Sequence, residues 1–168
     1  ISLVEEKIPG LKGELLEQEA YTLLGLYLIK RNLAVTAELG MWSESYFLNM
    51  KGQDFATFYI INNGINDFIA NLLFHFYIQG SKTALYISII NRELGQCSQY
   101  LSTLNQAAIY AKNDINKLLL HIQRSELYSL FGLNYFSNKE LKSASGYLQK
   151  ANLPRTQKNV IKWLLTFC

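Results

Sequence analysis

Proline and cysteine are both scarce in this chain of 168 residues. The two prolines, Pro9 and Pro154, leave about 140 residues between them without the residue that most strongly breaks helices. The two cysteines, Cys97 and Cys168, indicate neither a disulfide framework nor a metal site. These absences favour a helical protein in a reduced, cytoplasmic setting, without metal or cofactor.

Long apolar runs and a strong net charge are missing as well. The longest mostly apolar stretch, 68–78, is far shorter than the roughly 20 residues of a membrane helix, and no signal peptide is visible. The net charge is +3, and no run of five or more Lys or Arg occurs, so nucleic-acid binding by this chain is not indicated. Because the chain begins with Ile, we expect it to be part of a longer protein.

Catalytic motifs are also absent from the sequence. It contains no phosphate-binding glycine loop, no GxSxG, no HExxH and no CxxC. The two histidines, His75 and His121, fall in different predicted helices, and Cys97 lies at a predicted helix contact. We therefore predict that the chain is not an enzyme.

Apolar residues recur at intervals of three and four almost everywhere, which is typical of α-helices. The pattern predicts an all-α fold of about eight helices, in which 66–92 is either one helix kinked at Gly80 or two. Asn113 is a candidate N-cap, and Pro154 separates the last two helices. The predicted helices are 15–33, 42–50, 54–62, 66–92, 93–110, 113–136, 139–151 and 156–167.

An eleven-residue phrase occurs twice. NRELGQCSQYL begins at Asn91, and NKELKSASGYL begins 47 residues later at Asn138, with six identical positions. We interpret each copy as the end of one helix, a short turn, and a second helix that packs Cys97 or Ala144 closely against its partner. Such a period predicts a single domain, 1–168, built as a tetratricopeptide-like right-handed superhelix of helix-turn-helix pairs with a concave surface.

Polar side chains form a line along 66–92, at spacings of four or three residues that place them on one helix face. Two readings are open, a solvated face or the lining of a groove that binds an extended guest. Amide side chains suit a groove, because each both donates and accepts hydrogen bonds. The low charge of the line also supports the groove, because a solvated face usually carries more Glu and Lys. The line comprises Asp67, Asn71, His75, Gln79, Lys82 and Tyr86.

A second, weaker line follows on 113–136, and plain solvent exposure is the favoured reading there. Arg124 within it offers a two-pronged contact for a peptide carboxylate. The line comprises Asn113, Lys117, His121, Arg124 and Tyr128.

The segment ALYISIINREL, 84–94, followed by Tyr100, resembles the C-terminal helical-repeat domain of Rgg/GadR/MutR-type transcriptional regulators. Trp42, Tyr46 and Phe47 fit the family more loosely. The resemblance implies a repeat domain that binds a short imported signalling peptide and forms a homodimer. It implies as well that peptide binding changes the arrangement of the subunits and, with it, transcription. It also implies an N-terminal helix-turn-helix domain, for which residues 1–14 are too short, so DNA would be contacted only through a domain that this chain lacks.

Together these patterns predict the sensor domain of a bacterial quorum-sensing regulator. The alternative is a constitutive tetratricopeptide- or HEAT-like scaffold for protein partners, without a small ligand. The peptide sequence, the target DNA and the choice between activation and repression stay open. The residues predicted to bind peptide are Asp67, Asn71, His75, Gln79, Lys82, Tyr86, His121, Arg124 and Tyr128.

Overall fold

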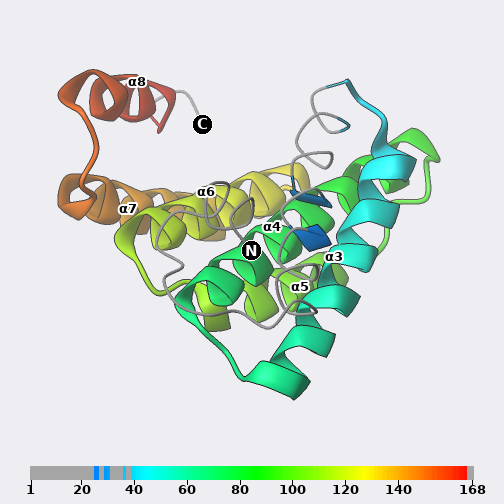
Figure 1. The fold of residues 1–168 in the computed structure, drawn as a ribbon. Helices are drawn as coiled ribbons and strands as arrows, with labels where there is room; N and C mark the ends of the chain where they lie inside the picture. Colours follow the sequence, from blue (N-terminus) through cyan, green and yellow to red (C-terminus); the bar gives the residue numbers. More distant parts are fainter. Residues whose placement is uncertain (1–24, 27–28, 31–35, 37–38, 166–168) are drawn as a thin grey trace. The chain divides into compact units, whose positions relative to one another are not determined.

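The computed structural model describes residues 25–26, 29–30, 36 and 39–165 (Figure 1). The chain divides into two compact units, Ile1–Ile87 and Ser88–Cys168. The described part is all-α, as predicted, and has no β-strand. It contains six helices, whereas about eight were predicted for the whole chain. The predicted helix 15–33 lies mostly outside the described residues. The helices are α3 (Trp42–Asn63), α4 (Asp67–Ile90), α5 (Cys97–Tyr110), α6 (Asp114–Leu130), α7 (Asn134–Lys150) and α8 (Arg155–Leu165).

The separate helices predicted at 42–50 and 54–62 are wrong, because α3 is continuous from Trp42 to Asn63. Gly52 does not break the helix. Because Gly52 has no Cβ, its backbone can lie against the ring of Phe76 on α4. A Cβ at this position would come within 2.6 Å of the ring carbons. Gly52 therefore serves close packing of two helices rather than a turn.

Residues 66–92 contain one helix rather than two, because α4 runs from Asp67 to Ile90 through Gly80. Asn66 precedes it, and its Oδ1 accepts a hydrogen bond from the Ile69 amide at 2.9 Å, the geometry of an N-cap. Gly80 is buried and faces Asn49 on α3, whose Nδ2 lies 3.5 Å from Thr83 Oγ1. The first unit is thus held by a close α3–α4 contact with a polar centre.

α4 ends in a turn, and the next helix begins several residues further along the chain. Arg92 takes a left-handed backbone conformation with φ 56, and the Glu93 amide donates to the Ser88 carbonyl at 3.0 Å. This is the helix-ending arrangement usually built with glycine. α5 then begins at Cys97 rather than at the predicted residue 93.

A glycine turn also divides the predicted helix 113–136. Asn113 caps α6 as predicted, accepting from the Asn116 amide at 2.8 Å. The helix ends at Leu130, because Gly132 adopts φ 71 and the Leu133 amide donates to the Tyr128 carbonyl at 2.8 Å. The chain re-enters a helix at once, so α7 begins earlier than the predicted residue 139.

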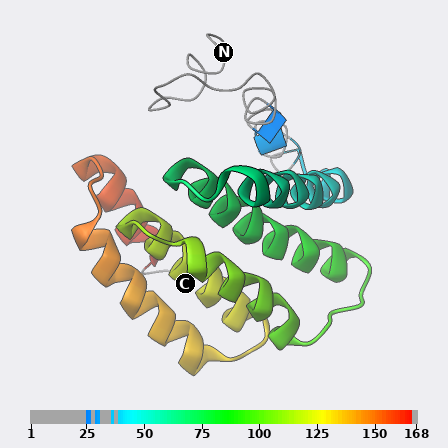
Figure 2. The same ribbon diagram turned by 60° about the horizontal axis from the view of Figure 1, so that its bottom comes forward.

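α6 and α7 form an antiparallel pair in the second unit (Figure 2). Ser125 Oγ lies 2.9 Å from Ser137 Oγ, which also lies 3.0 Å from the Ser125 carbonyl. Further along the pair, Leu118 packs against Ala144 and Leu148. α8 follows the break at Pro154, and its side chains Ile161 and Leu165 pack on the same cluster. Residues 166 and 167 of the predicted last helix lie outside the described residues.

The two copies of the repeated phrase have different conformations. In the first copy a helix ends at Ile90, a turn and loop follow, and α5 begins at Cys97, as interpreted. The second copy, 138–148, lies wholly inside α7, so its predicted helix end and turn are wrong. The repeat superhelix, which rested on this equivalence, stays a prediction.

Candidate functional site

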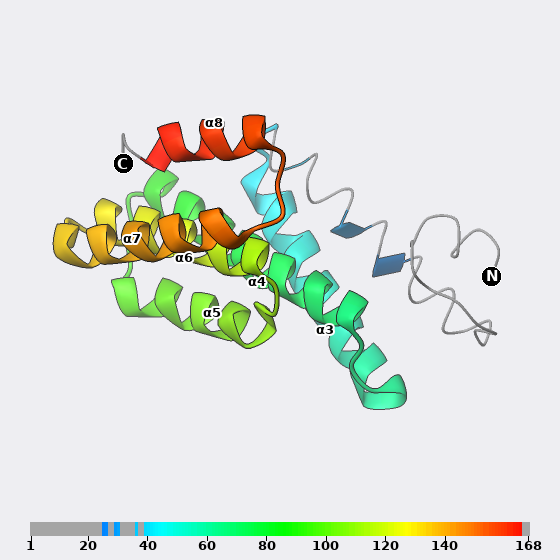
Figure 3. The same ribbon diagram turned by 90° about the vertical axis from the view of Figure 1, so that its left-hand side faces the viewer.

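α6 has neighbours in both α5 and α7 (Figure 3), and side chains of its polar line contact both helices. All four of its helical members, Lys117, His121, Arg124 and Tyr128, are half-buried. The favoured expectation of plain solvent exposure is therefore wrong for this line. Each of these side chains has an aromatic or polar neighbour on an adjoining helix, and these neighbours determine what the face can do.

His121 is held by two residues of α7. The Glu140 carboxylate accepts a hydrogen bond from His121 Nδ1, and the two side chains are exposed by 19% and 17%. On its other side the imidazole stacks on the Tyr147 ring, with centroids 5.3 Å apart and planes within 13°. Lys117 Nζ lies 5.8 Å from the centroid of the same ring, near enough for a cation–π contact. The imidazole is therefore fixed in position by α7.

Arg124 reaches toward α5 instead. Its Nη2 donates to Asn105 Oδ1 at 2.7 Å. The Nε atom of Arg124 is buried, and no hydrogen-bond partner for it is found in the part of the chain that the structure describes. A guanidinium carries five N–H donors in a planar fork that matches a carboxylate. The side chain thus keeps donor capacity beyond its bond to Asn105.

Tyr128 completes the line near the turn into α7, with its ring 5.5 Å from that of Phe136. Burial, reinforced by the charges of Glu140 and Cys97, raises the pKa of the Tyr128 phenol, and Arg124 opposes this shift. The pKa of the Cys97 thiol is raised by burial too. The phenol therefore stays protonated at neutral pH and offers a hydrogen-bond donor beside the guanidinium.

The line predicted on α4 belongs to the first unit. Asp67 is exposed at the start of the helix, while the other five members, Asn71, His75, Gln79, Lys82 and Tyr86, are half-buried. Most of the remaining positions of α4 are buried, with Phe74 and Phe76 completely so. The line is thus a partly accessible strip on a helix that is otherwise largely enclosed.

His75 lies in the middle of the α4 line. Burial, with a smaller contribution from the positive charge of Lys30, lowers the pKa of His75 to about 4. The imidazole is therefore neutral at pH 7, with one nitrogen able to donate and the other able to accept. A neutral imidazole suits contact with a peptide backbone rather than with a carboxylate.

Tyr86 closes the C-terminal end of the α4 line. Its ring stacks on that of Trp42 on α3, with centroids 4.6 Å apart and planes within 10°. Lys82 Nζ lies 5.9 Å from the Tyr86 ring centroid. Two members of this line, Lys82 and Tyr86, therefore take part in contacts around the Trp42–Tyr86 ring pair.

The nine predicted residues thus divide between two units, six on α4 and three on α6. Sequence reasoning missed the side chains that hold the α6 line. Glu140 and Tyr147 both lie in the second copy of the repeated phrase, and their spacing of seven residues placed them on one helix face. Asn105 carried no signal in the sequence.

The described residues contain no group of three or more His, Cys, Asp or Glu side chains arranged to hold a metal ion. Across the same residues, no helix combines the length and the apolarity that crossing a bilayer requires. Comparison of the chain with known protein families, with curated proteins and with solved structures finds no match.

Proposed function

We propose that this chain is the ligand-sensing domain of a bacterial quorum-sensing transcriptional regulator of the Rgg/GadR/MutR type, acting in the cytoplasm. The domain binds a short signalling peptide in the groove of a tetratricopeptide-like array and works as a homodimer. DNA is contacted by a helix-turn-helix domain elsewhere in the longer protein. The resemblance at 84–94 motivates this proposal, and the polar face of α6 supports it.

The single observation that carries the proposal is a pair of polar side chains on α6 that the neighbouring helices already hold in place. His121 is fixed by Glu140 and Tyr147, and Arg124 is held by Asn105. Polar side chains that are already ordered lose less side-chain entropy when a ligand binds, so they contribute more to affinity than mobile surface groups. They suit an extended peptide, whose backbone presents both N–H donors and carbonyl acceptors along its length.

Arg124 gives the peptide a direction in this proposal. Its guanidinium receives the C-terminal carboxylate, while the Tyr128 phenol donates to the same group. Charge-assisted hydrogen bonds of this kind are roughly twice as strong as neutral ones. In the first unit, the neutral His75 and the amides on α4 form a separate candidate face for peptide backbone.

Binding of the peptide controls transcription only if the peptide has different affinities for two arrangements of the dimer. The competing function is a constitutive helical-repeat scaffold, in which the same faces bind a folded partner and no switch exists. The large number of exposed apolar side chains on this chain, Phe47 and Trp163 among them, favours a scaffold as the second candidate.

The test is calorimetric titration of the purified chain with a library of short apolar peptides, each made with a free and with an amidated C-terminus. We expect saturable binding that amidation weakens about tenfold or more. Arg124→Gln should weaken binding of the free acid and leave binding of the amide nearly unchanged. Lys139→Gln, an exposed position on α7, is the matched control. A chain that ignores every peptide but captures a folded partner would favour the scaffold.

A further inference from the structure

The outer face of α3 is unusually apolar for a surface helix. Its buried face packs into the first unit through residues that include Ser45, Asn49 and Ala56. The opposite face carries large apolar side chains at intervals of three and five residues, and several of them are more than half exposed. Phe47 is 58% exposed, Phe58 52% and Ile61 77%. The exposed apolar side chains of this face are Phe47, Met50, Phe55, Phe58 and Ile61.

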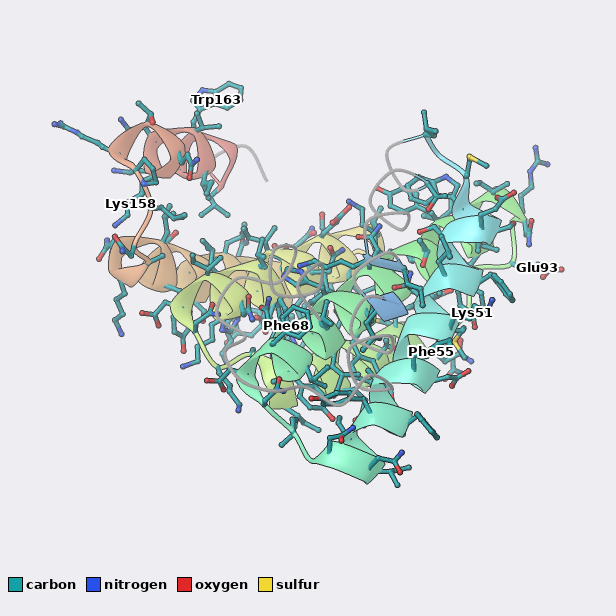
Figure 4. The ribbon with its side chains drawn as sticks, in the orientation of Figure 1. Lys51, Phe55, Phe68, Glu93, Lys158 and Trp163 are labelled. Atoms are coloured by element: carbon teal, nitrogen blue, oxygen red, sulfur yellow. The ribbon has the colours of Figure 1, made fainter. Side chains whose placement is uncertain are left out.

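We define the α3 stripe as these five residues together with Lys51 and Asp54, which lie among them. The stripe extends over about 21 Å at ~1.5 Å per residue, which is roughly four helical turns. Figure 4 labels Lys51 and Phe55 on this helix. Contiguous exposed apolar surface of this kind marks an interaction site in soluble proteins.

The two charges in the stripe indicate what covers it. Lys51 and Asp54 are exposed and lie at its centre, and Lys51 Nζ is 5.2 Å from the centroid of the Phe47 ring. The pair Lys51 and Asp54 has its midpoint between residues 52 and 53. The pair Phe47 and Phe58 has the same midpoint.

An antiparallel second copy of α3, related by a twofold axis at that midpoint, is therefore complementary to the first. It places Phe47 opposite the partner's Phe58 and brings Lys51 within reach of the partner's Asp54. The twofold axis repeats both contacts, so two aromatic pairs flank two opposite-charge pairs. A twofold interface requires a self-complementary patch of this kind.

We infer that the α3 stripe is a homodimer interface, in which two copies of α3 pack antiparallel about an axis between residues 52 and 53. This inference rests on the homodimer of the proposed function and identifies its contact surface. The proposed dimer forms without a bound peptide. The α3 stripe lies on the side of α3 opposite to the residues that pack into the first unit, so it is free to meet a second copy of the chain.

Charge reversal tests the register directly. Lys51→Glu replaces two attractions by two repulsions with Asp54, and Asp54→Lys does the same with Lys51. Each single variant should raise the dimer dissociation constant about tenfold or more.

Mixing the two variants should restore the dimer. The glutamate introduced at position 51 of one chain then faces the lysine introduced at position 54 of the other. The unchanged Asp54 of the first chain faces the unchanged Lys51 of the second. Both contacts are again between opposite charges, so the mixture should dimerise as tightly as the original chain.

The readout is the mass of the 168-residue chain by light scattering and sedimentation over a range of concentrations, without peptide. Lys142→Glu, an exposed charge reversal on α7, is the control and should leave the dissociation constant unchanged. Phe47→Glu with Phe58→Glu should give a monomer with an unaltered helical circular dichroism spectrum.

Three results would overturn the inference: a chain that is monomeric at every concentration, a dimer that tolerates both reversals, or a mixture no tighter than the single variants. Peptide titration of the same samples is read separately. Loss of peptide binding with an intact dimer would count against the sensor function alone, while a peptide-binding dimer that tolerates both charge reversals would count against the interface alone.

Discussion

Replacement of Gly52 by alanine sets two effects of opposite sign against each other. Gly52 lies inside α3, where alanine is favoured over glycine by about 1 kcal/mol of helix propensity. The new Cβ, however, would lie 2.6 Å from two carbons of the Phe76 ring. Phe76 is fully buried, so its ring has no solvent-exposed space to move into. Overpacking of this kind costs about 1–3 kcal/mol. Because the ring is fully buried and the contact is far inside van der Waals distance, we expect a cost near the upper end and a net loss of ~1–2 kcal/mol after the gain in helix propensity.

Gly146 provides the matched control for this substitution. It lies inside α7, is exposed, and a Cβ built on it meets no atom within 4 Å. Gly146→Ala should therefore stabilise the chain by about 1 kcal/mol, since only the helix propensity changes. Urea denaturation followed by far-UV circular dichroism measures both variants. A Gly52→Ala chain that is as stable as the original would refute the close contact of α3 with α4.

A second substitution removes the other partner of the contact. Phe76→Leu alone should cost about 1 kcal/mol or more as a loss of buried volume and shape. In the Gly52→Ala background it should cost clearly less, because the smaller side chain makes room for the new methyl group. Additive effects of the two changes would show that the ring and the glycine do not touch.

Three further predictions follow from single residues. Because His75 has a pKa of about 4 in the folded chain against an ordinary 6.5, the stability that its neutral form permits is complete above pH 6.5 and is lost as the pH falls toward 4. The free energy of unfolding, measured by urea denaturation at pH 7 and at pH 4.5, should fall less in His75→Gln than in the original chain, by up to about 3 kcal/mol. Arg92→Gly should stabilise the chain by ~0.5–1 kcal/mol, because glycine adopts the left-handed conformation at φ 56 without strain, and an unchanged or lower thermal midpoint would contradict this. Leu148→Ala should lower the free energy of unfolding by roughly 2–5 kcal/mol, since Leu148 is 5% exposed in the core of the second unit. Leu101→Ala should cost less, because Leu101 is half-buried. Equal losses in denaturation experiments would argue against this packing.

The helical class was predictable because the periodicity of apolar residues reports directly on helix faces. Several boundaries were not, and glycine explains most of these errors. Gly52 falls in the gap between the predicted helices 42–50 and 54–62 but is a packing residue inside α3, whereas Gly132 falls inside the predicted helix 113–136 and ends α6. One residue type serves both purposes, and only its three-dimensional neighbours distinguish them. Arg92 is the reverse case, since its side chain does not indicate the left-handed turn that it makes.

The polar lines were predictable as lines but not in their surroundings. A spacing of three or four residues places side chains on one face whether that face meets solvent, a ligand or another helix. What decides between these is the register of the neighbouring helix. On α6, that register brings Glu140 and Tyr147 onto His121, contacts between residues 19 and more positions apart that no local pattern encodes.

These contacts also make α6 the stronger of the two candidate faces. On α4, Lys82 and Tyr86 are committed to an aromatic pair with Trp42, and His75 is neutral, so the strip offers a ligand mainly amide groups. On α6, Arg124 is held by one bond to Asn105 and retains a planar fork of donors. A charged donor in a half-buried position, already ordered before binding, contributes both affinity and direction to a carboxylate ligand. The proposed function is therefore tested most directly at Arg124, where the loss of one side chain separates free acids from amides.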